Sequence, residues 1–140
     1  MTAARWELTP HGADVGVRGV GISKAQAFEQ AALALTAAIT EPASVSAKEC
    51  IEIACEAADD ELLLVNWLNA VIYEIAVRKM LFARFEVHIE GTNLRARAWG
   101  EAIDSAKHQP AVEIKGATCT GLAVRRDDNG CWSAQCVVDV

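Results

Sequence analysis

Residues 59–79 read DDELLLVNWLNAVIYEIAVRK and give the clearest secondary-structure signal in the sequence. Apolar side chains recur there at the spacing of one wide helix face. They are Leu63, Leu64, Trp67, Leu68, Val71, Ile72 and Ile75. Asp59 and Asp60 put acidic groups at the positive end of the helix dipole, while Arg78 puts a basic group at the negative end. The segment therefore predicts an amphipathic helix that buries one face.

An earlier segment predicts a second helix. Ser23 and Gln26 are spaced as in a capping box, in which hydroxyl and amide satisfy each other's free N–H groups. Apolar residues at helical spacing follow: Phe28, Ala31, Ala32, Leu35, Ala38 and Ile39. This helix should end near Thr40, because Pro42 cannot continue it.

Most of the remaining chain predicts β-strands. A short strand at 6–8 should stop at Pro10, and the other expected strands are 15–20, 45–55, 81–89, 94–99, 112–118, 122–126 and 132–138. Residues 127–130 read DDNG, which is typical of the turn of an antiparallel hairpin. Strand meanders around two helices predict an α+β fold. We expect a single compact domain over residues 1–140, with both helices packed on one face of a mixed, mostly antiparallel sheet.

Composition narrows the class of protein. The chain has 140 residues, is 52% hydrophobic and has a net charge of -6, which suits one globular domain and disfavours direct binding to phosphate backbones. Any role with RNA should therefore run through a protein partner.

The apolar stretch 62–77 is too short and too interrupted for a membrane span, and residues 1–7 do not resemble a signal peptide, so we expect a cytoplasmic protein.

The five cysteines are an odd number and include no CxxC pair. This pattern argues against a disulfide framework and against a structural zinc site. Free cysteines are usually buried, so we expect reduced thiols in the core.

Oxygen donors near the two ends of the sequence are the main candidates for chemistry. Asp14 lies where a loop enters a strand, and Asp139 and Val140 follow directly from another strand. If Asp14 faces that end, its carboxylate, the Asp139 side chain and the α-carboxylate of Val140 converge, a donor set that calcium, magnesium and manganese prefer. The alternatives are an aspartate that caps a turn and an ordinary frayed terminus.

Several segments resemble the archease family. Residues 11–17 (HGADVGV) resemble its HTADIGI-type opening, 27–32 (AFEQAA) its AFENAA helix, and 64–69 (LVNWLN) its LVDWLN segment. Further similar segments follow in the family's order at 85–87, 100–101, 108–110, 112–118 and 132–140. The resemblance therefore extends over about residues 6–140. Departures from the family pattern are Gly12, Asn66, Gly116 and Cys119, and none of them removes an expected metal ligand.

This resemblance implies a non-catalytic accessory protein of a GTP-dependent RNA ligase in tRNA splicing and RNA repair. It would promote guanylylation of the ligase and so its multiple turnover. The family's divalent-metal ligands correspond to Asp14, Asp139 and Val140, with calcium expected and magnesium or manganese as alternatives. The family's functional lysine corresponds to Lys115, for which a merely solvated side chain is the alternative. His11 is a candidate for orienting the metal ligands.

His108 is a further candidate for such an orienting role.

Two other functions remain open. The same oxygen donors would suit a small metal-dependent phosphoesterase, with His11 as the nearby acid or base. A chaperone-like protein-binding module is the other possibility, in which the metal would only hold the terminus in place. The sequence contains no P-loop, GxSxG, HExxH or GxGxxG motif that would favour another enzyme class.

Overall fold

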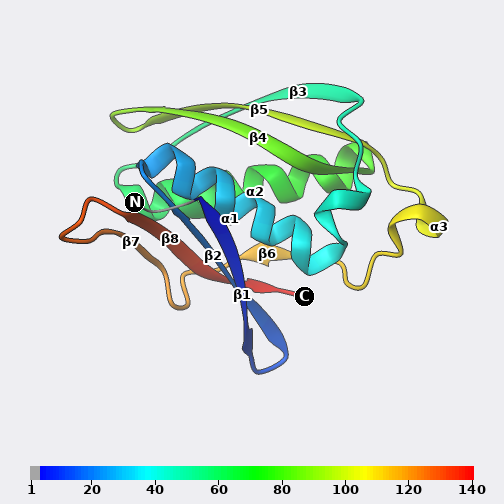
Figure 1. Cartoon of the computed structure of the whole chain (residues 1–140), viewed down its shortest axis with the longest axis horizontal. Coiled ribbons are helices and arrows are strands. Elements are labelled where there is room, and N and C mark those ends of the chain that lie inside the picture. Colours follow the sequence, from blue (N-terminus) through cyan, green and yellow to red (C-terminus); the bar gives the residue numbers. More distant parts are fainter. Residues whose placement is uncertain (1–3) are drawn as a thin grey trace.

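The computed structural model describes residues 4–140 and has two long helices between two β-sheets (Figure 1). The helices are α1 (Lys24–Ile39) and α2 (Asp60–Arg78). The three-stranded sheet has the order β3-β5-β4, formed by β3 (Glu49–Glu56), β5 (Asn93–Ala102) and β4 (Met80–Glu90). The five-stranded sheet has the order β1-β2-β8-β6, and β7 also pairs with β8. Its strands are β1 (Arg5–His11), β2 (Asp14–Gly21), β6 (Gly116–Ala117), β7 (Ala123–Arg126) and β8 (Trp132–Asp139). Two short helices complete the fold: the 3₁₀ helix η1 (Pro42–Ser44) and α3 (Ser105–His108).

The α+β class is confirmed, and the strands divide into two sheets where one was expected. Every strand pair in the described part of the chain is antiparallel. Helix α1 can lie between two sheets because its buried residues surround most of its circumference. Gly19 of β2 allows a close approach on one side, since a Cβ there would lie 2.0 Å from the Ala27 carbonyl oxygen. On the other side, Thr36 donates a hydrogen bond to the Phe82 carbonyl of β4.

The predicted apolar face of α2 forms the centre of the core. Trp67 is fully buried, its indole N–H donates to the Phe28 carbonyl at 3.0 Å, and its ring meets Phe85 edge-on at 5.9 Å between centroids. The buried cluster includes residues of both helices and both sheets. Among residues 4–140, no helix is long and apolar enough to cross a membrane.

The predicted helix starts are confirmed, with one difference in side-chain bonding. The Asp59 carboxylate accepts from the Leu62 N–H at 2.8 Å, and the Ser23 hydroxyl accepts from the Gln26 N–H at 3.0 Å. The Gln26 side chain accepts from the Ile22 N–H instead of the Ser23 N–H. Ser23 and Gln26 therefore complete only half of the expected capping box.

Several strands differ in length from their predictions. The strand expected at 45–55 begins only at Glu49, and the one expected at 94–99 extends to Ala102. Strand β1 continues through Pro10 to His11. Proline is tolerated there because β1 is an edge strand, so the missing N–H interrupts no hydrogen bonding inside the sheet. The strand expected at 112–118 contracts to Gly116–Ala117, and residues 111–115 are irregular. The hairpin predicted from 127–130 is confirmed, since β7 pairs antiparallel with β8.

The cysteines follow the core prediction only in part. All five thiols are free, and Cys136 is buried, but Cys50 and Cys119 are exposed. The expectation of core thiols is therefore wrong for these two. Cys50 lies on the exposed face of β3, and Cys119 lies in an exposed loop. Burial raises the pKa of Cys136 to about 12 and that of Cys55 to about 11, so these two thiols stay protonated and unreactive at neutral pH.

Candidate metal centre

A tight hairpin fixes the position of Asp14. His11 and Asp14 are the last residue pair of the β1–β2 ladder, and two residues connect them. Gly12 has a φ of +60°, whereas Ala13 is not in the left-handed region, the pattern of a type II′ turn with glycine at its first central position. Asp14 is therefore the first residue of β2, half-buried and held by the turn.

Strand β8 brings Asp139 and Val140 beside Asp14. Val15 pairs with Val138, so the next step of the register sets Asp14 opposite Asp139. Residues opposite each other in an antiparallel pair have neighbouring side chains on one face. The Val140 N–H donates to the Asp14 carboxylate at 3.3 Å. Asp14 thus contacts a residue 126 positions away. Among residues 4–140, its carboxylate accepts no hydrogen bond from its own turn.

Lys115 lies on the other side of β8. Its backbone N–H donates to the Asp139 carbonyl at 2.8 Å, and the next residue, Gly116, is the register partner of Asp139. The Lys115 side chain is exposed, and within residues 4–140 it forms no ion pair. Strands β2 and β8 and the residue before β6 thus bring Asp14, Asp139 and Lys115 to one end of the five-stranded sheet.

The donor set at this end fits a hard divalent cation. The carboxylates of Asp14 and Asp139 and a main-chain oxygen of Val140 are the oxygen ligands that calcium, magnesium and manganese prefer. In the described part of the chain, no group of three His, Cys, Asp or Glu side chains could hold a metal ion. A site here would therefore need Val140 as its third donor. So few protein ligands would leave coordination positions for other oxygens.

Comparison with known proteins identifies the family. Residues 6–140 match the Archease protein family. The chain belongs to the archease family. It is 39% identical to Protein archease of Pyrococcus abyssi and 36% identical to that of Pyrococcus furiosus, covering 97% of this chain and 99% of each relative. The solution structure of Methanobacterium thermoautotrophicum protein 1598 superposes with a TM-score of 0.84 at 27% identity, covering 96% of this chain and 98% of that one.

The two histidines considered for the metal centre lie in different places in this member of the archease family. His11 is exposed and is the cross-strand partner of Asp14, so it lies beside the candidate centre. His108 is buried, and its ring contacts Glu101 at 3.0 Å and the Asp104 N–H at 2.9 Å. The expectation that His108 orients the metal ligands is therefore wrong, because both ring nitrogens are used in another network.

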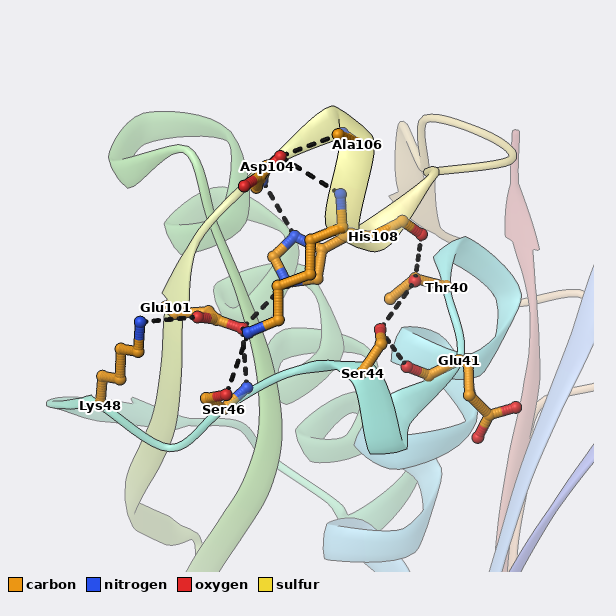
Figure 2. Close-up of polar contacts among 10 residues, drawn as sticks. Thr40, Glu41, Ser44, Ser46, Lys48, Glu101, Asp104, Ala106 and His108 are labelled. Carbon is orange, nitrogen blue, oxygen red and sulfur yellow. Dashed lines mark hydrogen bonds and ion pairs between the residues drawn. The ribbon is translucent and has the colours of Figure 1, made fainter.

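That network centres on Glu101, a buried acid that the sequence did not mark out (Figure 2). Glu101 accepts hydrogen bonds from the Lys107 ammonium at 2.6 Å, the Ser46 N–H at 2.8 Å and His108, while Lys48 lies 3.5 Å away. These groups join the end of β5, α3 and the segment before β3. The archease-like fragments around Glu101 and His108 were the sole sequence signal, and nothing in their spacing predicts the contact.

This network predicts a pH dependence of stability. The hydrogen bond from Lys107, with those from Ser46 and His108, holds the pKa of Glu101 well below its usual value of 4.5. An acid whose pKa is lowered by folding adds stability above its unfolded pKa, and that stability is lost as the pH falls through the folded pKa. Glu101→Gln should therefore be less stable than wild type at neutral pH and should lose less stability on acidification.

The measurement is the melting temperature of both proteins from about pH 6, above the ordinary glutamate pKa, to about pH 3, below it. The two curves should converge as the pH falls. Glu52→Gln, on an exposed strand position, is a control for the loss of one carboxylate. Parallel curves for wild type and Glu101→Gln would contradict the assignment.

Proposed function

We propose that this chain is a metal-binding accessory protein, with no turnover of its own, that activates a GTP-dependent RNA ligase in the cytoplasm during tRNA splicing and RNA repair. Membership of the archease family supports an accessory role. The observation that best supports the metal-dependent part is the contact between the Val140 N–H and the Asp14 carboxylate. It gathers oxygen donors of β2 and β8 at one end of the sheet, next to the backbone of Lys115.

In this proposal, Asp14, Asp139 and a main-chain oxygen of Val140 hold the cation, calcium by expectation and magnesium or manganese as alternatives. A bound divalent cation would polarise phosphate oxygens of the nucleotide and neutralise their charge. The rigid hairpin at Asp14 and the register of β8 pre-arrange the two aspartates. The protein therefore binds the cation without having to order a loop first.

Lys115 has a separate role in the proposal. An exposed ammonium with no ion-pair partner in the described residues is a point charge that can pair with a phosphate or with an acidic residue of the ligase. RNA itself would be contacted through the ligase, since the net charge of -6 disfavours direct binding to its backbone. The residues thus divide into those that bind the cation and one that meets the partner.

The test is ligation of phosphate-ended to hydroxyl-ended RNA by a GTP-dependent RNA ligase under multiple-turnover conditions, with and without this protein. We expect the protein to raise the turnover rate and the rate of ligase guanylylation. A ligase guanylylated beforehand should complete its first turnover at the same rate in either case. Absence of stimulation would contradict the proposal.

Two further measurements separate the alternatives. Metal-dependent release of phosphate from model esters by the isolated protein would favour a phosphoesterase. Unchanged partner binding after chelation, together with a lower melting temperature, would favour a protein-binding module in which the metal only stabilises the fold.

A further inference from the structure

The segment that bears Lys115 has little regular structure to hold it. On the β8 side, the Lys115 N–H donates to the Asp139 carbonyl at 2.8 Å, and the Thr118 N–H donates to the Val137 carbonyl at 3.0 Å. The strand between them, β6, contains only two residues. A strand this short depends on whatever satisfies its other edge, because a half-buried N–H without a partner is costly.

Asn69 of α2 satisfies that other edge. Its side-chain oxygen accepts from the Ala117 N–H at 2.8 Å. The same oxygen would lie 3.6 Å from a Cβ built on Gly116, so the amide rests against both residues of β6. Figure 1 shows α2 and β6 as neighbours, with β8 on the far side of β6. The Lys115 segment is therefore held between the candidate metal centre and the middle of α2.

Asn66, one helical turn earlier on α2, makes a different contact. Its amide N–H donates to the Glu56 carbonyl at the end of β3, in the three-stranded sheet. The two asparagines thus tie the same helix to different sheets. Only the bond made by Asn69 adjoins Lys115, so the pair offers an internal comparison.

We infer that Asn69 is a positioning residue for Lys115, acting by holding β6 against β8 so that the lysine stays next to Asp139. This inference rests on the proposed activation of an RNA ligase. It adds a residue of α2, a helix that supplies no candidate metal ligand, to the residues on which the proposed function depends. The required property is a hydrogen-bond acceptor at position 69, so a side chain of similar shape that still accepts should suffice.

The experiment compares Asn69→Leu, Asn69→Asp and Asn66→Leu with wild type. Asn69→Leu removes the acceptor, and we expect amide hydrogen exchange at Lys115 and Ala117 in the isolated protein to accelerate roughly tenfold, the size of effect expected for one lost hydrogen bond. Ligase stimulation should fall below the wild-type value. Asn69→Asp keeps an acceptor and should restore both values.

Asn66→Leu is the matched control, since it removes one asparagine hydrogen bond from the same helix. It should leave stimulation and exchange at Lys115 at the wild-type level. Wild-type exchange at Lys115 in Asn69→Leu, or an equal loss of ligase stimulation in the two leucine variants, would overturn the inference. Failure of the wild-type protein to stimulate the ligase would instead refute the proposed function, and the exchange measurement would still decide whether Asn69 holds the segment.

Discussion

Asp14→Asn is expected to abolish stimulation of the RNA ligase and to leave the fold intact. The asparagine keeps a side-chain oxygen that can accept from the Val140 N–H, so the contact between β2 and the end of β8 can persist. The change removes the negative charge that a divalent cation requires. Groups that only orient a metal ligand already contribute about ten- to a hundredfold to affinity, so loss of a charged ligand should reduce calcium affinity by roughly a hundredfold or more.

The measurement is calcium binding by calorimetry, alongside multiple-turnover ligation. Asp128→Asn is the matched control, because Asp128 is an exposed aspartate in the β7–β8 turn, at the opposite end of β8 from Asp139. It should behave as wild type in both assays. Undiminished stimulation by Asp14→Asn would remove the basis for a metal-dependent role.

Lys115→Ala is expected to separate partner activation from cation binding. Because the side chain is exposed, stability and calcium affinity should stay close to their wild-type values. Hydrogen bonds between charged groups contribute about 1.5–3 kcal/mol, so stimulation should fall by roughly ten- to a hundredfold. Lys115→Arg should recover part of the loss, because it keeps the charge and changes the geometry.

Stimulation should be measured over a series of protein concentrations, so that weaker binding to the ligase can be told from a slower guanylylation step. Arg125→Ala removes an exposed cation from β7 and controls for the change in net charge. Full stimulation by Lys115→Ala at every concentration would assign this lysine to an ordinary solvated position.

Much of the secondary structure could be predicted because its signals are local. The caps at Ser23 and Asp59 and the apolar face around Trp67 lie within one or two helical turns of the elements that they define. The turn residues 127–130 likewise adjoin both strands of their hairpin. Periodicity, caps and turn chemistry act over short ranges, and the sequence displays them directly.

The arrangement of strands into two sheets could not be predicted in the same way. The alternation of β3 and that of β8 look alike in sequence, and nothing local states which partner each strand selects. The role of Asn69 was missed for the same reason, since its hydrogen-bond partner is Ala117, 48 residues away. Residue patterns left the meeting of Asp14 with Val140 open, and only the family resemblance favoured it.

The central place of β8 has a consequence for how the protein folds. This strand pairs with β2, β6 and β7, so the larger sheet lacks its middle until residues 132–139 are available. Chains are synthesised from the N-terminus, and contacts between distant segments form slowly. During synthesis the β1–β2 hairpin therefore has one edge unpaired until β8 has been made, and Asp14 can meet Asp139 only after that. A cation captured at this end would report that β8 has paired with β2.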